Sequence, residues 1–444
     1  GGAGGAGGAG GAGGASASAW VRSLKTAGDT ELVDAIAWPA GGIVALGRTS
    51  AYGAGDSDLA VISIAADGTI RWAKSLGGVD RETPGALTLT DSGDILVVGS
   101  TYSHSPARWE DGWVVRLDGL GKVAWQKSIG TNKIEGLSSV LAVGGDRYLL
   151  GGTAGVQSVF SGWLAEIDGN GAVQWQRYYD LGGRGLNVRS IVRSPNGELT
   201  LVGTADQFVS PNDVDGLVLR LDSTRKLLWS RWFSGPMQTS NQAVTLMDAF
   251  GLSNGAVVMA GHVGSPGNTS DKATAALVFE VDASGSLKWS RTISATGKTT
   301  RAVGLVPTGS GMMLLGSTTG YGSTRRPLLI DLTTSGALQS QLGLGAAYGA
   351  GLAGGVANSS GDVYGVGFDN QSSGSPSPLV VKAPSLTPLA SCQGATTSGL
   401  SAGGLALTAT TDLPKDTAAA ATVQTSTLQV ADMPLAAVPA SCSQ

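Results

Sequence analysis

One phrase returns along this chain about every fifty residues and constrains its fold more than any other feature. Its fullest form is Asp-x-x-Gly-x-x-x-Trp, which occurs at 118–125, 168–175 and 282–289. Weaker copies end at Trp72 and Trp229, and a decayed copy runs through Gly336 and Leu338. A repeat of this length, with glycine turns and runs of β-forming residues, indicates one radial array of small sheets.

Each repeat contains four short apolar or alternating runs separated by turn residues. In the third copy these runs cover 138–143, 148–152, 163–168 and 172–178. Four strands joined by glycine-rich turns form one antiparallel propeller blade. The first hairpin turn carries a glycine in every copy, at Gly42, Gly93, Gly145, Gly197, Gly255, Gly311 and Gly361. The second strand also ends near a glycine, at Gly47, Gly99, Gly151, Gly203, Gly261, Gly316 and Gly367. Seven copies predict seven blades.

The seventh copy, 351–384, contains three strand-like runs and no fourth run with a tryptophan. The missing run lies at the other end of the chain, where Trp20 begins a stretch that matches the one at Trp72. We therefore expect 20–24 to form the outer strand of the last blade and to close the ring, which removes an open sheet edge. The predicted fold is all-β: an arm at 1–19, a seven-bladed β-propeller at 20–384 and an extension at 385–444.

The tryptophan at the start of each outer strand is expected to pack between neighbouring blades. A large aromatic ring buried there stabilises the fold by about 2–3 kcal/mol. The alternative interpretation, in which these rings are platforms for a ligand, is the weaker one, because their spacing follows the blade repeat.

The repeated phrase resembles the tryptophan-docking repeat of pyrroloquinoline-quinone-like β-propellers and of related secreted bacterial propellers. The resemblance covers roughly 20–382 and is specific for architecture. Quinoprotein enzymes of that group have eight blades, a calcium site and often a vicinal cysteine pair. This chain has seven predicted blades and no vicinal cysteines, so no cofactor is expected.

Composition excludes several classes of function. The formal net charge is −4 and only 14% of the residues are charged, whereas nucleic-acid binding requires a basic surface. No run of eighteen apolar residues occurs, so no membrane-spanning helix is expected. The chain begins at Gly1 without a methionine, which we interpret as a processed or trimmed chain.

The two cysteines, Cys392 and Cys442, lie near the two ends of a Ser/Thr/Ala-rich extension. We expect a disulfide between them, closing a loop of about fifty residues and contributing about 4 kcal/mol in the chain-entropy model. Such a bond predicts an oxidising compartment, hence a secreted or cell-surface protein. Two free thiols are the alternative. The extension lacks the blade phrase, and 422–430 and 405–411 are its candidate strands, forming a small cap or pairing with a neighbouring molecule.

Residues 1–14 repeat Gly-Gly-Ala with a period of three. A flexible linker is the plain interpretation of such a segment. The period also fits a polyproline-II-type helix, here polyglycine II, in which the alanines line one edge and leave two edges of bare glycine. Another backbone can approach such edges closely, so we expect this arm to become ordered against partners and to join subunits. The predicted assembly residues are Gly1, Gly2, Ala3, Gly4, Gly5, Ala6, Gly7, Gly8, Ala9, Gly10, Gly11, Ala12, Gly13 and Gly14.

Candidate binding residues fall in the loops between second and third strands, which emerge on one face. Three acids there, Asp58, Asp111 and Asp215, are weak calcium candidates, although capping the third strand is the stronger interpretation. The same loops carry aromatic residues that form a binding face or fold back over the blades: Tyr52, Tyr102, Trp109, Phe160, Phe208 and Tyr321.

The sequence shows no recognisable set of catalytic residues. Its two histidines, His104 and His262, stand in different repeats without matched partners. We expect a non-enzymatic extracellular structural protein, a subunit of a self-assembling filament or surface assembly whose partners are copies of itself. The alternative is a surface adhesin or binding module that grips a glycan or peptide on the loop face.

Overall fold

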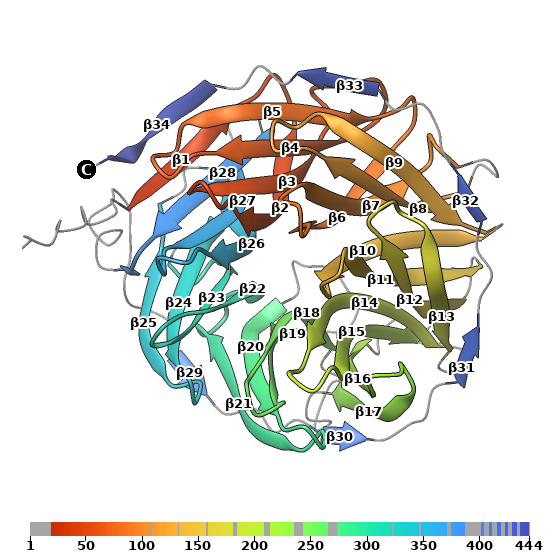
Figure 1. Cartoon of the computed structure of the whole chain (residues 1–444). Helices are drawn as coiled ribbons and strands as arrows, with labels where there is room; N and C mark the ends of the chain where they lie inside the picture. The colour runs from red at the N-terminus through yellow and green to blue at the C-terminus, as the bar shows by residue number, and fades with distance from the viewer. Residues whose placement is uncertain are drawn as a thin grey trace, which may run out of the picture.

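The chain forms a ring of seven antiparallel sheets around a central axis, a seven-bladed β-propeller, in the computed structural model (Figure 1). The structure describes residues 19–386 except 106–108, 132, 157–158, 181–183, 208–213, 235–242, 265–272, 322–323, 346–347 and 371–373. Beyond 386 it describes six strand segments, at 401–403, 408–410, 415–418, 422–424, 429–432 and 436–443. The described residues contain no helix long and apolar enough to cross a membrane.

The blades follow the chain in order, each with its first strand at the axis and its fourth at the rim. Blades 1 and 2 are β2 (Thr30–Ala37), β3 (Ile43–Thr49), β4 (Asp58–Ile64), β5 (Ile70–Gly77), β6 (Glu82–Leu89), β7 (Ile95–Thr101), β8 (Asp111–Leu117) and β9 (Val123–Gly130). Blades 3 and 4 are β10 (Ile134–Ala142), β11 (Arg147–Val156), β12 (Val159–Asp168), β13 (Val173–Asp180), β14 (Arg184–Arg193), β15 (Leu199–Gln207), β16 (Val214–Leu221) and β17 (Leu227–Ser234). Blades 5 and 6 are β18 (Ala243–Gly251), β19 (Val257–Gly264), β20 (Ala273–Val281), β21 (Leu287–Ser294), β22 (Thr300–Pro307), β23 (Gly311–Thr318), β24 (Arg326–Thr333) and β25 (Leu338–Gly343).

Blade 7 contains both ends of the propeller. It consists of β26 (Ala350–Ala357), β27 (Val363–Asn370), β28 (Pro376–Ala383) and, from the start of the chain, β1 (Trp20–Lys25). The register of β1 against β28 is antiparallel, with Trp20 opposite Lys382. The prediction that an N-terminal strand closes the ring is therefore confirmed.

Apolar side chains fill the space between adjacent blades. Leu46 and Val61 of blade 1, for example, form one fully buried cluster with Val97 and Val115 of blade 2. The second and third strands are sandwiched between two neighbours, so their residues are buried on both faces, as in β4 and β7. Continuous apolar runs are typical of strands covered on both sides.

The repeated tryptophans of every blade but blade 6 pack against the next blade, as predicted. The Nε1 atom of Trp125 in blade 2 donates to the carbonyl oxygen of Gly169 in blade 3, at 3.1 Å. Its ring lies over Gly171, where a Cβ atom would come within 2.9 Å of it. Gly171 has a φ of 73°, a conformation that glycine adopts at little cost. Trp20, Trp72 and Trp229 make the same Nε1 bond to the next blade.

Two departures from the phrase have physical reasons. In blade 4 Arg225 takes the place of the glycine, with a φ of 73°, and its guanidinium lies 5.8 Å from the ring centre of Trp175. In blade 6 Leu338 stands where the tryptophan is expected. The next blade is the closing one, whose third and fourth strands are the two separate ends β28 and β1, so no hairpin turn is there to receive a ring.

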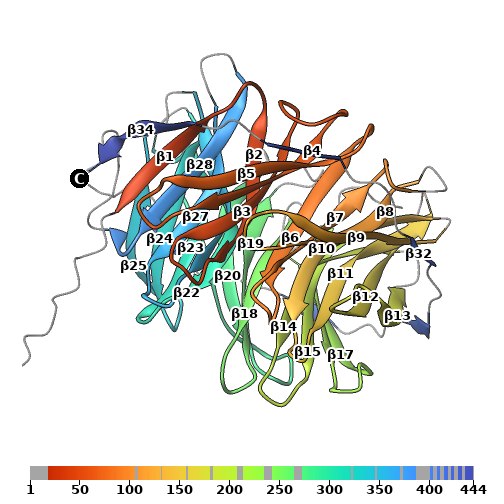
Figure 2. The same cartoon turned by 45° about the horizontal axis from the view of Figure 1, so that its top comes forward.

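The C-terminal strands form a belt around the rim (Figures 1 and 2). Each pairs antiparallel with an outer strand, so that six blades gain a fifth strand. The pairs, in belt order, are β29 (Ser401–Gly403) with β21, β30 (Thr408–Thr410) with β17, β31 (Lys415–Ala418) with β13, β32 (Thr422–Gln424) with β9, β33 (Gln429–Asp432) with β5, and β34 (Ala436–Ser443) with β1. The belt therefore runs against the order of the blades.

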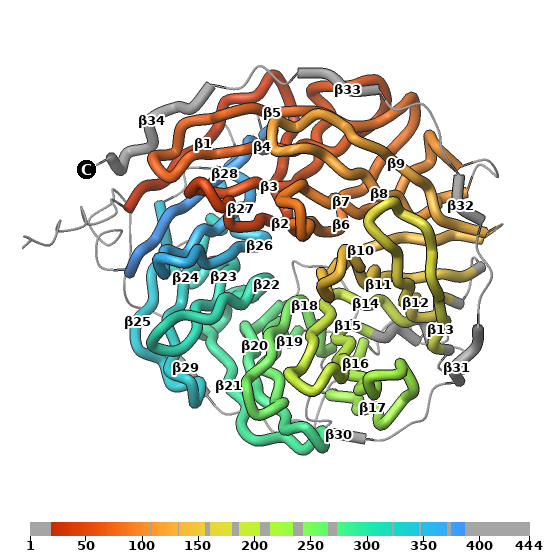
Figure 3. The backbone as a smooth tube through the Cα atoms, in the orientation of Figure 1, coloured from red at the N-terminus to blue at the C-terminus, as the bar shows by residue number. Residues whose placement is uncertain are grey.

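This arrangement corrects two expectations about the extension. Its strands do not gather into a small cap but are spread along the rim of their own ring (Figure 1). The backbone trace in Figure 3 shows the ring of blades around which they lie. The run 422–430 is not one strand, because β32 ends at Gln424 and β33 begins at Gln429 on the next blade. The candidate strand 405–411 contains β30.

The docking contact can be separated from backbone strain with two alanine variants. Gly171 and Gly93 both have positive φ, so alanine at either position costs about 1–2 kcal/mol in the left-handed region. Only at Gly171 would the new Cβ also meet a tryptophan ring, since nothing lies within 4 Å at Gly93. We expect Gly171→Ala to lower the urea midpoint of unfolding clearly more than Gly93→Ala. Equal losses would show that the ring contact contributes little.

Candidate functional site

The seven innermost strands surround a central channel, and each has a β-bulge at the same place. The ladder shifts register between the following pairs: Leu32/Asp34, Pro84/Ala86, Leu137/Ser139, Val188/Ser190, Leu246/Asp248, Ala302/Gly304 and Leu352/Gly354. A bulge leaves an extra residue out of the ladder and turns the strand locally. The residue left out of the ladder at each bulge lines a cavity of about 380 Å³ on the axis of the ring.

Two half-buried aspartates at the bulges join neighbouring blades. Asp34 accepts backbone N–H groups from Ala35 at 2.8 Å and from Leu87 of the next blade at 3.1 Å. Asp248 does the same with Ala249 at 2.8 Å and with Leu305 of the next blade at 2.9 Å. Each carboxylate thus satisfies a donor that the bulge removes from the ladder.

In blade 3 a serine also makes a hydrogen bond to the next blade, here as the donor. The Ser138 hydroxyl lies 3.1 Å from Oδ1 of Asn187 and 2.5 Å from the carbonyl oxygen of Val188, both in blade 4. The polar side chains of the channel wall therefore connect blades 1 and 2, 3 and 4, and 5 and 6.

The acids of the channel have raised pKa values. Burial raises the pKa of Asp34 to about 7, and the charge of Asp248 adds to the shift. Burial raises the pKa of Asp248 to about 6, against hydrogen bonds from Leu305, Ala249 and Ser190 that lower it. The guanidinium groups of Arg189 and Arg301 belong to residues that line the same cavity. The lining of the channel thus combines two carboxyl groups with two guanidinium groups.

The sequence reasoning missed these channel residues. The repeated phrase does not include the bulge position, and the acid there recurs in only two blades. Aligning the repeats would have revealed it, because Asp34 and Asp248 stand where the other blades have Ala86, Ser139, Ser190, Gly304 and Gly354. A charged residue at a position otherwise small or neutral is the signal.

The three predicted acids lie at the starts of third strands and are buried. Oδ2 of Asp58 accepts the N–H of Ala54 at 3.0 Å, which fits the capping interpretation. Glu82 of the next blade lies close enough to Asp58 to raise its pKa, and Glu135 does the same to Asp111. Burial raises the pKa of Asp58 to about 7 and of Asp111 to about 6.

These acids pair across blade boundaries, which the sequence did not indicate. Oε1 of Glu82 accepts the Thr101 hydroxyl at 2.8 Å, and Oε2 accepts the N–H of Gly78 at 3.1 Å. Among the described residues, no three His, Cys, Asp or Glu side chains form a group that could hold a metal ion. The calcium hypothesis for Asp58, Asp111 and Asp215 stays a prediction.

The predicted aromatic residues fall into two groups, those that pack against the blades and those with an exposed ring or a ring near a cation. Tyr52 and Tyr321 pack against apolar clusters of the blades, and the Tyr321 ring lies over Gly343. Trp109 is 39% exposed, and the ring of Tyr102 lies 5.0 Å from the guanidinium of Arg81. Phe160 is half-buried. Phe208 lies outside the described residues.

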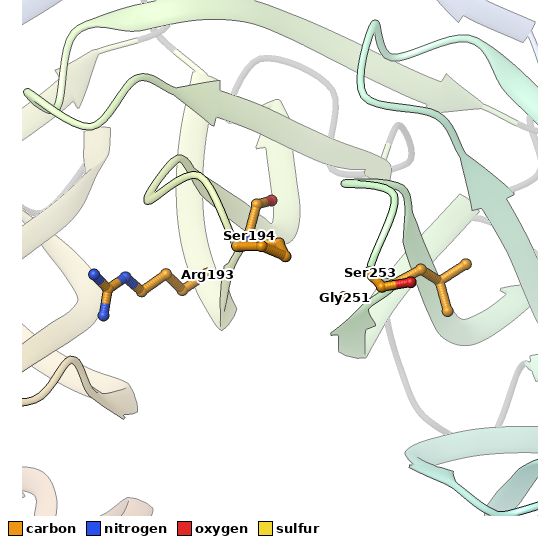
Figure 4. A pocket seen from close by; sticks show the side chains of 6 residues that line it. Arg193, Ser194, Gly251 and Ser253 are labelled. Carbon is orange, nitrogen blue, oxygen red and sulfur yellow. The ribbon is translucent and has the colours of Figure 1, made fainter.

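A second hollow, of about 490 Å³, lies between the first hairpin turns of blades 4 and 5 (Figure 4). The side chain of Arg193 points away from Ser253 and donates to the carbonyl oxygen of Val143 at 2.7 Å. Ser194, Pro195, Gly251 and Leu252 complete the lining. Arg193, the one charged residue among the described residues that line this hollow, is thus bonded to blade 3.

The two histidines are far apart in the ring. His104 is buried with its ring 5.4 Å from that of Trp113 in blade 2. His262 lies in β19 of blade 5, and burial lowers its pKa to about 4. Neither the arm at 1–14 nor Cys392 falls within the described residues, and Cys442 lies in β34, of which the backbone is described.

Comparison with known proteins finds only remote structural likenesses. No family model and no curated protein matches the chain. Similar solved structures include a protein of unknown function from Dyadobacter fermentans, with 12% identity, a TM-score of 0.45 and coverage of 82% of this chain and 97% of that one. The polysaccharide lyase Uly1 shows 10% identity, a TM-score of 0.46 and coverage of 81% and 88%. A glucose dehydrogenase shows 11% identity, a TM-score of 0.37 and coverage of 82% and 98%.

The raised pKa of Asp34 predicts how stability depends on pH. The folded state holds the proton more tightly than the unfolded chain does, so the free energy of unfolding falls as pH rises from about 4 to about 7. Asp34→Asn cannot lose a proton, and we expect it to reduce this fall by on the order of 1–4 kcal/mol. Urea unfolding at several pH values measures the change.

A matched control uses an acid with the opposite shift. The pKa of Asp67 is lowered by hydrogen bonds from Thr69, so its folded state favours the charged form. We expect Asp67→Asn to leave the fall between pH 4 and 7 in place. An unchanged fall in Asp34→Asn would contradict the assignment.

Proposed function

We propose that this protein is a non-enzymatic, secreted or cell-surface structural protein. In this proposal it is a subunit of a filament or surface assembly joined through its Gly-Gly-Ala arm. The observation that carries the proposal is the way in which the chain enters the ring after the arm. Strand β1, which follows the arm directly, lies between two strands, with β28 on one side and β34 on the other.

This placement makes β1 a firm anchor. Its residues pair with Leu379–Lys382 of β28 on one edge and with Ala436–Ser443 of β34 on the other. A pull on the arm therefore acts on two ladders at once. Trp20 is 2% exposed, and its Nε1 donates to the carbonyl oxygen of Ala66 in blade 1 at 3.0 Å. An arm that joins subunits needs such an attachment, whereas a simple linker does not.

The ring suits a passive scaffold. The channel acids accept backbone N–H groups across blade boundaries, and the docked tryptophans join the blades at the outside. Through Trp20, which bonds Ala66, force applied at blade 7 is passed on to blade 1. The proposed partners are copies of the same chain, with no cofactor.

The alternative function, a surface adhesin or binding module for a glycan or peptide, is favoured by one observation. Trp109 is among the few large apolar side chains that the described surface exposes, and the carboxylate of the next residue, Glu110, accepts the Tyr102 hydroxyl at 3.3 Å. An exposed aromatic ring is suited to stacking on a sugar or a peptide side chain.

The arm is tested with two matched fourfold variants and a deletion. Replacing Gly4, Gly7, Gly10 and Gly13 by alanine places a Cβ on a bare edge and blocks close backbone approach. Replacing Ala3, Ala6, Ala9 and Ala12 by glycine leaves that edge bare. In negative-stain electron microscopy we expect filaments from the native chain and from the glycine variant, and single rings from the alanine variant and from a chain lacking 1–14. Filaments from the deletion, or single rings from the native chain, would refute assembly through the arm.

The alternative predicts a separate result. If the loop face binds a glycan or peptide, Trp109→Ala removes that affinity in an array screen at least about tenfold, the effect of losing one aromatic anchor. Assembly should be unaffected by the same change. Val79→Ala, another exposed apolar residue, serves as the control because it lies outside the predicted aromatic set.

A further inference from the structure

Two buried acids at the starts of third strands each face an acid of the next blade. Asp58 is 2% exposed at the start of β4, and Glu82 is fully buried at the start of β6. A Cβ atom on Gly77 would lie 1.9 Å from Oδ1 of Asp58 and 2.7 Å from Oε2 of Glu82, so the two oxygens are close together. Asp111 of blade 2 and Glu135 of blade 3, both buried, hold the same two positions.

The first pair contains an oxygen that no described donor reaches. Oδ1 of Asp58 is buried and has no hydrogen-bond partner. The nearby backbone donors bond other oxygens, because the N–H of Ala54 donates to Oδ2 of Asp58 and the N–H of Gly78 donates to Oε2 of Glu82. Two ionised carboxylates can only accept, so a hydrogen bond between them requires that one of them carry a proton.

A metal ion does not fit between these acids. Calcium takes six to eight oxygen ligands, often with several carboxylates among them. Over the ranges that the structure describes, no further acid, histidine or cysteine joins either pair to form a metal-binding group. A proton needs only the two facing oxygens.

Other titratable groups around the pairs do not supply a full compensating charge. His104 faces Glu82, but burial lowers its pKa, so the imidazole is neutral at neutral pH. Burial raises the pKa of Glu135, although the charge of exposed Lys133 opposes the shift. Burial and the charge of Glu135 raise the pKa of Tyr178 to about 12, so this phenol is neutral as well. The cation Lys133 thus favours earlier loss of the proton from the second pair.

Each pair lies beside a backbone bond that joins two blades. The N–H of Glu82 donates to the carbonyl oxygen of Ser57 at 2.7 Å, and the N–H of Glu135 donates to that of Glu110 at 2.7 Å. Ser57 and Glu110 directly precede the aspartates of the two pairs. Repulsion between the carboxylates would therefore act on these bonds, and at the second junction on the loop that carries Trp109.

We propose that one proton bridges Asp58 and Glu82, that another bridges Asp111 and Glu135, and that loss of these protons loosens both sides of blade 2. Burial raises the pKa of Asp58 to about 7 and that of Asp111 to about 6. A raised folded-state pKa contributes stability that is complete below the unfolded value, near 4, and is lost as pH rises through the folded value. The first junction therefore loosens up to about pH 7 and the second up to about pH 6.

Hydrogen exchange of the full-length protein, resolved to single amides, tests the proposal. The amides of Glu82 and Glu135 report the two junctions, with protection expressed relative to the unfolded rate at each pH. In the native protein we expect protection of both amides to fall at least about tenfold between pH 5 and pH 8. Asp58→Asn supplies a side-chain N–H that does not titrate, so the fall at Glu82 should disappear while the fall at Glu135 remains. Asp111→Asn should have the reverse effect.

Asp215→Asn is the matched control. Asp215 holds the place of Asp58 in blade 4, but Val244 of blade 5 stands where Glu82 stands in blade 2. We expect this change to leave the fall at both reporting amides. Native protection that is equal at pH 5 and pH 8 would overturn the proposal, as would a Glu82 amide that Asp58→Asn leaves pH-dependent or unprotected at both pH values. Protection restored at pH 8 by added calcium would also overturn it, since the pairs would then hold a cation.

Discussion

The structure depends on one contact, the packing of a tryptophan ring on the glycine turn of the next blade. The ring needs a flat surface without a Cβ atom, and the turn needs a residue that accepts positive φ, so glycine meets both demands at once. The Trp125–Gly171 pair shows this geometry, and the Nε1 bond to Gly169 fixes its orientation. Repeated around the ring, the contact sets the spacing of the blades, from which the even step and register of the belt follow.

The closing blade is where this order is broken, and the break explains several features together. Blade 7 is built from β26–β28 and β1, so it lacks the hairpin turn that would receive a ring from blade 6. Leu338 consequently replaces the tryptophan. The same joint receives β34, the last strand of the belt, which covers the free side of β1. Both ends of the chain therefore reinforce the seam at which a ring would otherwise open.

Sequence patterns predicted the features that repeat. The seven blades, the closing strand at Trp20 and the docking role of the tryptophans follow from punctuation that recurs in each copy. The belt was missed, because strands of three or four residues, such as β29 and β30, are too short for alternation to reveal them. These strands begin seven residues apart, a regularity that can be recognised only once the outer strands are known. Asp34 and Glu82 were missed for another reason: their importance comes from partners in the next blade, about fifty residues away, which no local pattern encodes.

The proposed assembly depends on β1, the strand that ties the arm to two ladders. Cryo-electron microscopy of the native assemblies, at a resolution that separates backbones, tests this claim most directly. The account predicts that residues 1–14 of one subunit lie against the backbone of other subunits and continue without a break into β1. Assemblies joined by ring faces, with arms that touch no other subunit, would contradict it.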